Sequence, residues 1–166
     1  MKSLLDTAAI FTAERKELRR YLRFIYSTGE TINASDGGVC ICFETSQYPL
    51  GYYLPEGLQV ILEDRYPDID RVLSNFERRA EEVDLKDGKP CEVNGIKYLH
   101  YEGRNYSSHF SEWYIKKIKR LGKGITTKVV TNETNSSIWQ VMLFSGVLVE
   151  KYDRTPFKGV LMPVRI

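Results

Sequence analysis

The sequence predicts an α+β domain in which helices pack on antiparallel strands, and three observations lead to that prediction. Its 166 residues suit one domain. Eleven Tyr, seven Phe and two Trp favour half-buried sheet surfaces. Apolar residues recur at helical spacing in a few segments, while Asp-Gly and Asn-Gly turns separate segments of alternating polarity. We expect a helix and three strands, an insertion over residues 54–104, and a second helix with three strands.

The first half should begin with a helix over Ser3–Glu17, in which Ser3 is the N-cap and Asp6 the acid of a capping box. Three strands should follow this helix. They are Leu18–Tyr26, Thr31–Ala34 and Val39–Phe43. The last two flank Ser35-Asp36-Gly37-Gly38, and Asp-Gly between two strand patterns is a strong hairpin signal.

The middle of the chain and its second half show weaker but readable patterns. In the middle we expect a strand at Gly57–Asp64, a helix at Asp68–Arg79, and a hairpin of Cys91–Val93 with Ile96–Tyr101 around Asn94-Gly95. In the second half we expect a helix at Phe110–Leu121, which Gly122 ends, and strands at Ile125–Thr131, Ser137–Phe144 and Gly159–Ile166. The sequence therefore predicts a two-fold internal pattern.

The composition excludes some classes of protein. The net charge of +2 is too small to indicate nucleic-acid binding by itself, so any basic surface has to come from local clusters. No run of eighteen apolar residues occurs, and Asp6 comes too early for a signal peptide. Three cysteines provide no disulfide framework. We expect a cytoplasmic protein without a membrane partner.

Three stretches, in order, resemble the last domain of the bacterial DNA polymerase sliding clamp. The first is Leu4–Phe43, an Ala-rich helix followed by strands with a Ser-Asp-Gly turn similar to the Thr-Asp-Gly turn of clamp domains. The second is Phe110–Leu121, similar to the clamp's Phe-x-x-x-Tyr helix. The third is the ending Met162-Pro163-Val164-Arg165-Ile166, similar to the clamp's Met-Pro-hydrophobic-Arg-Leu ending. Together they cover roughly two thirds of the chain.

A fourth stretch, Arg65–Leu73, resembles the segment that joins two clamp domains, although it lies in the wrong place for a single domain. The resemblance implies one DNA-clamp-like domain over residues 1–166, with residues 54–104 as an insertion. Clamp chains have three such domains and form a six-domain ring around DNA as dimers. A ring of this chain would need six copies, or a partner that supplies the missing domains.

The resemblance also implies a function, which is that of a non-enzymatic clamp-like protein. Such a protein contacts double-stranded DNA nonspecifically and binds short peptides of polymerases or other replication and repair proteins. It implies a homo-oligomer and no cofactor. A second hypothesis is a phage or mobile-element protein of the same fold that engages a host's replication machinery without forming a ring.

Basic residues cluster where a clamp would contact DNA, near the end of the first helix and along the second. They are Arg15, Lys16, Arg19, Arg20, Lys116, Lys117, Lys119, Arg120 and Lys123. Such a surface attracts phosphates without reading sequence. Solvated helix faces, with cations favoured near a helix carboxy terminus, explain the same cluster equally well.

The resemblance places a peptide-binding groove at the last strand. Its residues would be Tyr114, Ser137, Met162, Pro163, Val164 and Arg165. Met and aromatic side chains suit a pocket that accepts varied apolar anchors. The alternative is that Val160, Met162 and Val164 simply pack a last strand into the core, which is the better interpretation for Val160.

Enzymatic and metal sites have weaker support. A small cytosolic enzyme that uses His100 or His109 with Cys91 is a third hypothesis, but no orienting motif accompanies these residues. Cys40 and Cys42 lack a second ligand pair with zinc spacing. Asp68, which could bind a cation with neighbouring acids, is better explained as a helix cap. We therefore expect no catalytic residue and no metal ligand.

Overall fold

The computed structural model describes the chain except for residues 1–2, 75, 77–79, 135–136, 152 and 165–166, and it leaves out the side chains of residues 132–139. Within the described part, nine strands form one sheet in the order β5-β4-β1-β2-β3-β12-β11-β10-β6. Three further strands form a second sheet in the order β7-β8-β9. Each neighbouring pair is antiparallel, so the protein belongs to the α+β class, as the sequence predicts.

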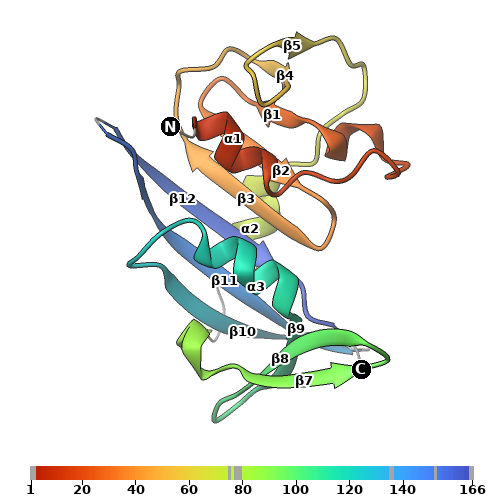
Figure 1. Ribbon diagram of the computed structural model, residues 1–166, viewed down its shortest axis with the longest axis vertical. Coiled ribbons are helices and arrows are strands. Elements are labelled where there is room, and N and C mark those ends of the chain that lie inside the picture. The colour runs from red at the N-terminus through yellow and green to blue at the C-terminus, as the bar shows by residue number, and fades with distance from the viewer. Residues whose placement is uncertain (1–2, 75, 77–79, 135–136, 152, 165–166) are drawn as a thin grey trace.

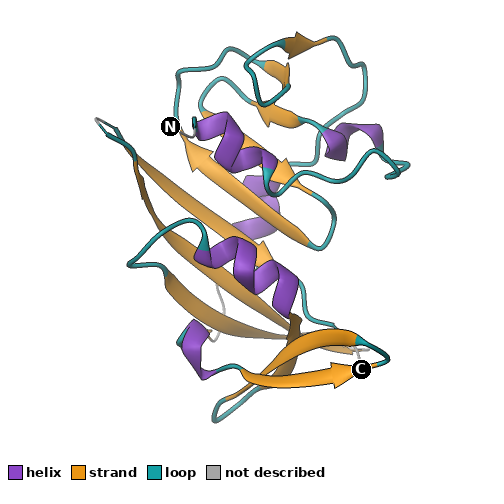
Figure 2. Ribbon diagram, in the orientation of Figure 1, coloured by secondary structure: helices purple, strands orange, loops and turns teal. Residues whose placement is uncertain are grey.

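The strands of the large sheet are β1 Ile25–Ser27, β2 Thr31–Ser35, β3 Val39–Glu44, β4 Gly51–Tyr53, β5 Gln59–Val60, β6 Ala80–Glu82, β10 Thr126–Thr134, β11 Ser137–Val149 and β12 Arg154–Leu161. Those of the small sheet are β7 Lys89–Val93, β8 Ile96–Glu102 and β9 Ser107–Ser111. The helices are α1 Leu4–Ala9, α2 Ile69–Ser74 and α3 Glu112–Lys119, with short 3-10 helices η1 Arg20–Arg23 and η2 Leu85–Asp87 (Figure 2).

The helix-and-three-strand pattern occurs twice, as predicted. Helix α1 precedes β1, β2 and β3, and α3 precedes β10, β11 and β12. The two sets meet where β3 pairs with β12, so the strand order of one set is reversed in the other. Figure 1 shows α1 and α3 on the same face of the large sheet, one over each set of strands. The chain thus forms two similar halves about the β3–β12 junction.

Each face of the large sheet carries its own core. On the α1 and α3 side, Leu5, Phe11 and Ile118 pack against strand residues such as Phe144. Helix α1 is fixed at its start by the capping box, because Ser3 Oγ accepts from Asp6 N and the Asp6 carboxylate accepts from Ser3 N. On the opposite face, a second cluster includes residues of α2 and β12.

The predicted hairpin between β2 and β3 forms, and one carboxylate organises it. Asp36 Oδ1 accepts from Gly38 N at 2.8 Å and from Val39 N at 3.1 Å. Gly37 has φ of +96°, which a residue without a side chain adopts without strain. Asp36 Oδ2 accepts from the Tyr114 hydroxyl at 2.8 Å, so the hairpin is also attached to α3.

The first predicted helix and the strand after it are shorter than expected. Helix α1 ends at Ala9 and not at Glu17, because the chain tightens into turns there and Thr12 Oγ1 donates to Ala9 O at 2.8 Å. Residues 18–24 form η1 and its flanks, and only Ile25–Ser27 becomes strand. The apolar Leu18 is 90% exposed, so its place in the alternating pattern does not reflect burial.

Three later segments also differ from expectation. Of Gly57–Asp64, only Gln59–Val60 pairs as a strand, since Gly57 closes a turn with Leu54 just before it. Helix α2 covers Ile69–Ser74 of the predicted Asp68–Arg79, of which residues 75 and 77–79 lie outside the described part. The last strand runs over Arg154–Leu161 and not from Gly159 onward, because after Leu161 the backbone N–H groups of Met162 and Val164 donate to Gly38 O and His109 O instead. Residues 165–166 lie outside the described part.

Candidate functional site

A cleft of about 160 Å³ opens at the end of β12, and we call it the Met162 cleft. It lies where the β2–β3 hairpin, η1, α2 and the residues after β12 meet. Its apolar lining includes Leu22, Val39, Ile69, Val72, Val160 and Met162. Arg19 and Tyr21 line it as well. Met162 is held in place because its N–H donates to Gly38 O at 2.9 Å.

Helix α2 is positioned as a wall of this cleft by local chemistry. Pro67 precedes it, and Asp68 Oδ1 accepts from Arg71 N at 3.1 Å, which is the capping role that the sequence predicts for Asp68. Ile69 and Leu73 are buried under the helix, while Val72 is 36% exposed. Asp70 pairs with Lys158 of β12 at 2.9 Å. These contacts attach a short helix to the sheet next to Met162.

An aromatic cluster packs against the cleft through Tyr21, which belongs to both. Tyr66 stacks on Tyr26 with ring centroids 4.8 Å apart, and it meets Tyr21 edge to face. Its hydroxyl is buried without a hydrogen-bond partner in the described part of the chain. Burial, with a smaller contribution from the Cys40 thiol, raises the pKa of Tyr66. Burial likewise raises the pKa of Cys40 to about 12, so this thiol remains protonated and packs as a small apolar group.

Of the predicted groove residues that the structure describes, Met162 alone lines this cleft. Met162 lines it, and the half-buried Pro163 and Val164 follow, with Val164 N donating to His109 O at 2.8 Å. Tyr114 lies on the α3 side of the hairpin, where its hydroxyl reaches Asp36. The side chain of Ser137 and the whole of Arg165 lie outside the described residues.

Most of the lining residues were not among the site residues predicted from the sequence, although one signal pointed to some of them. Ile69 and Val72 belong to Arg65–Leu73, the stretch whose clamp-like pattern seemed misplaced in the chain. Leu22 and Val39 carry no such signal, because their place depends on how η1 and the hairpin pack together. The cleft is thus a non-local feature.

The predicted DNA-contacting residues fall in two parts of the chain, which are the segment from Arg15 to Arg20 and the helix α3 with the loop after it. Arg15, Lys16 and Arg19 follow α1 in the chain, and Arg20 begins η1, so none of them is on the first helix itself. The others are on α3 or directly after it. They are Lys116, Lys117, Lys119, Arg120 and Lys123. Arg19 lies against the hairpin, since a Cβ on Gly37 would meet its guanidinium at 2.6 Å.

Several of these cations already have partners. Arg19 pairs with Glu17 at 2.9 Å, which together with the Arg19 backbone lowers the pKa of Glu17 to about 2. Lys116 pairs with Glu112 at 3.4 Å. Lys117 Nζ lies 3.4 Å from the centroid of the Trp113 ring, a cation–π contact, and burial lowers the pKa of Lys117.

The remaining cations are free to attract anions. Within the described ranges, no hydrogen-bond or ion-pair partner is seen for the side chains of six of them, and all six are exposed. These residues are Arg15, Lys16, Arg20, Lys119, Arg120 and Lys123. Their charge is the part of this surface that a polyanion could use.

The histidines form a stacked pair on the small sheet. His100 and His109 face each other across β8 and β9 with ring centroids 4.5 Å apart, and His100 Nε2 is 2.8 Å from Ser107 Oγ. Cys91 pairs in register with Tyr98, and among the described residues it makes no hydrogen bond to either imidazole. Burial, followed by the charge of His100, lowers the pKa of His109. No cluster of three or more potential metal ligands occurs in the part of the chain that was searched.

Comparisons with known protein families, with curated proteins and with solved structures find no match to this chain. No helix among the described residues is long and apolar enough to cross a lipid bilayer. The Met162 cleft and the basic surface are therefore the two features from which a function can be argued.

Proposed function

We propose that this protein is a non-enzymatic, clamp-like binding protein that captures short peptides of replication or repair proteins in the Met162 cleft and contacts DNA through its basic surface. One observation carries the proposal. Val72 and Met162 come from the two stretches, Arg65–Leu73 and the ending, that resemble separate parts of a clamp, and they line the same cleft. Two resemblances that are far apart in the sequence thus meet at one candidate binding site.

The chemistry of the cleft suits an apolar peptide anchor. Its lining includes five aliphatic side chains and one methionine, and a thioether on a flexible side chain adapts to different partners. Arg19 stands among the lining residues and offers a charged group to a peptide backbone or an acidic residue. A short extended peptide with one or two apolar anchors is the occupant that this lining fits.

The basic surface supports the second half of the proposal. Its cations come from the segment after α1, from the start of η1, and from α3 and the loop after it. Unpaired lysines and arginines without a base-reading element give affinity that depends on salt and not on sequence. This is the kind of contact that a protein needs in order to stay on a duplex without stopping at a site.

Peptide capture can be tested by panning a phage-displayed library of short random peptides on the protein and measuring the selected peptides by fluorescence anisotropy. We expect Val72→Asp to weaken their binding by roughly tenfold or more, since each 1.4 kcal/mol of lost contact is a factor of ten. Helix α2 is short, so circular dichroism and thermal unfolding of the variant must accompany the binding assay.

A matched control is available on the same sheet. Val149 is an exposed valine at the end of β11 that pairs with Arg154, the opposite end of β12 from Met162. Val149→Asp should bind the selected peptides as the unmodified protein does. If both aspartate variants bind equally well, or if panning selects no peptide that Val72→Asp weakens, the Met162 cleft is not a peptide groove.

A further inference from the structure

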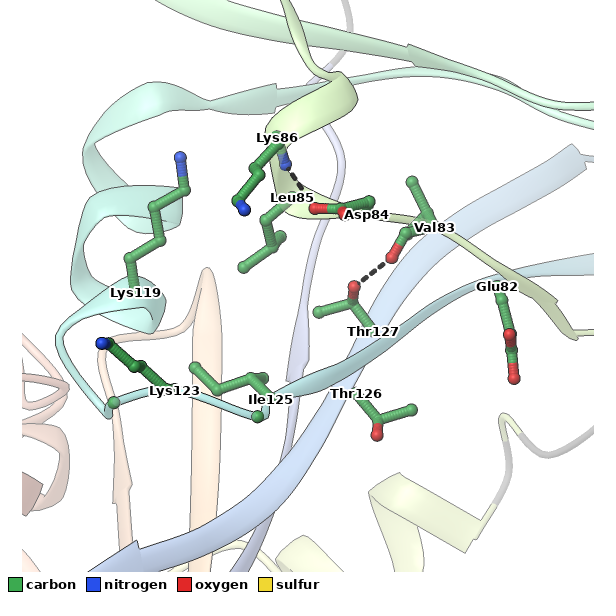
Figure 3. A pocket seen from close by; sticks show the side chains of 12 residues that line it. Glu82, Val83, Asp84, Leu85, Lys86, Lys119, Lys123, Ile125, Thr126 and Thr127 are labelled. Atoms are coloured by element: carbon green, nitrogen blue, oxygen red, sulfur yellow. Dashed lines mark hydrogen bonds between the residues drawn. The ribbon is translucent and has the colours of Figure 1, made fainter.

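A second and larger cleft lies between the end of α3 and η2, and we call it the lysine cleft. Its volume is about 1000 Å³. One wall is formed by Lys119 and by the loop that contains Lys123, and Lys86 of η2 belongs to the other wall. Figure 3 shows these three lysines toward one end of the cleft. Segments far apart in the sequence thus bring three ammonium groups to one opening.

The three lysines are not neutralised by neighbouring carboxylates. None of their side chains has an ion-pair or hydrogen-bond partner among the residues that the structure describes. Two acids also line the cleft. The Asp84 carboxylate accepts from Lys86 N at 2.9 Å as the cap of η2, and Glu82 lies at the end away from the lysines (Figure 3). Asp84 thus lies beside Lys86, with its Oδ1 atom engaged as the cap, while Glu82 is away from all three lysines.

The loop adds backbone donors to the lysines. Gly122 and Gly124 have φ of +121° and +79° and flank Lys123, and a Cβ on either glycine would meet nothing within 4 Å. The N–H groups of Lys123 and Gly124 donate to no other described residue. Successive free amides beside lysines are a favourable surface for an anion with several oxygens. The opposite wall is fixed, because the Thr127 hydroxyl donates to Val83 O.

We propose that the lysine cleft binds phosphate groups of a nucleic-acid backbone, with Lys86, Lys119 and Lys123 as the contacting residues. This inference rests on the proposed DNA contact and extends it. Lys86 belongs to the 54–104 segment, and the DNA contact proposed above includes no residue of that segment. The phosphate path runs from the exposed side of α3 through Lys119 to η2. Lys119 belongs to both surfaces.

The lining favours a backbone over a free nucleotide. Among the described residues no aromatic side chain lines the cleft, so a base finds no ring there on which to stack. A site with cations and no base-stacking platform recognises phosphates regardless of sequence.

The test compares Lys86→Gln with Lys89→Gln in duplex binding by fluorescence anisotropy over a range of salt concentrations. Lys89 is an exposed lysine of the same 54–104 segment that does not line the cleft. Losing one phosphate contact lowers the salt slope by about 0.9 and the affinity by roughly threefold to tenfold. We expect this change in Lys86→Gln and in Lys123→Gln, with Lys89→Gln unchanged. Equal slopes for Lys86→Gln and the unmodified protein would overturn the proposal.

A second measurement distinguishes the source of the phosphate and separates this proposal from the peptide function. Inorganic pyrophosphate, followed by the NMR amide signals of Gly122 and Gly124, should bind weakly and be displaced by the duplex. Pyrophosphate that the duplex does not displace would overturn the nucleic-acid assignment in favour of a site for a small phosphate compound. If the unmodified protein binds no duplex, this proposal and the DNA contact both fail, while peptide capture in the Met162 cleft is judged by its own assay.

Discussion

Asp36 connects the two halves of the protein through a single carboxylate. Its Oδ1 atom closes the β2–β3 hairpin by accepting from Gly38 N and Val39 N, and its Oδ2 atom accepts from the Tyr114 hydroxyl of α3. Gly38 permits this approach, since a Cβ there would lie 2.7 Å from the Tyr114 hydroxyl oxygen. The turn that holds Met162 N through Gly38 O is therefore also held by α3.

Removing the Tyr114 hydroxyl should weaken this connection. A hydrogen bond to a charged acceptor contributes about 2 kcal/mol, so we expect Tyr114→Phe to lower the free energy of unfolding by about that amount. Urea denaturation measures the change. Tyr98→Phe is the control, because within the described residues the half-buried Tyr98 has no hydrogen bond from its hydroxyl. A Tyr114→Phe protein as stable as the Tyr98→Phe protein would show that the connection contributes little.

The same bond predicts a spectroscopic signature. Burial raises the pKa of Tyr114, and the hydrogen bond to Asp36 raises it further, because the bond favours the protonated phenol. In an ultraviolet titration, the unmodified protein should therefore show one more tyrosine that ionises above the ordinary pH range than Tyr114→Phe does.

At the scale of elements, local patterns predicted those parts of the fold that local chemistry decides. The capping box at Ser3, the Asp-Gly hairpin at Asp36 and the Asn-Gly hairpin between β7 and β8 all form where the residues indicate. The two helix-and-three-strand sets follow from periodicity. What periodicity could not predict is which residues of each segment find a partner strand.

Two segments show why the rest was missed. Leu18 and Leu58 fit alternating strand patterns, yet they are 90% and 62% exposed, so hydrophobicity alone misled the assignment. The Met162 cleft and the Tyr66 cluster depend on the crossing of residues 61–68 to the face opposite α1 and α3. Neither the spacing of apolar residues nor the identity of turn residues predicts such a crossing.

The β3–β12 junction should be the least tolerant element. Gly159 lies in β12 between Ile41 of β3 and Phe144 of β11. A Cβ there would be 2.2 Å from the Phe144 ring and 2.5 Å from the Cys40 carbonyl oxygen. Backbone cannot yield as a side chain does, so Gly159→Ala should lower the free energy of unfolding by about 3 kcal/mol in urea denaturation.

A substitution on the neighbouring strand is the control for the effect on stability of any side-chain change in this sheet. Ser145 is exposed on β11 and pairs with Lys158, so Ser145→Ala should leave the stability nearly unchanged. A small effect of Gly159→Ala, close to that of Ser145→Ala, would mean that the two halves join more loosely than the packing indicates.

At the scale of the whole molecule, the two edges of the large sheet differ in the groups that they expose. The sheet ends in β5 on one side and β6 on the other, with two and three residues in the described part of the chain. Short edge strands present few free backbone groups. The β5 end also carries exposed apolar residues, namely Leu50, Leu58 and Ile61. Exposed apolar groups gathered at a sheet edge favour association.

We therefore expect self-association through the β5 end, measured as mass by light scattering over a range of protein concentrations with and without duplex DNA. If the β5 end of one copy contacts a different surface of the next copy, head to tail, the chain of copies can close into a ring. A ring of six copies would have a mass of about six times 19.2 kDa. Ile61→Lys should return the protein to 19.2 kDa, because a lysine would be buried at the contact. Leu18→Lys, at a residue 90% exposed on another part of the surface, should leave the mass unchanged.

A mass of 19.2 kDa for the unmodified protein under all these conditions would reject the self-assembled ring and favour a clamp-like interaction protein that acts as a monomer.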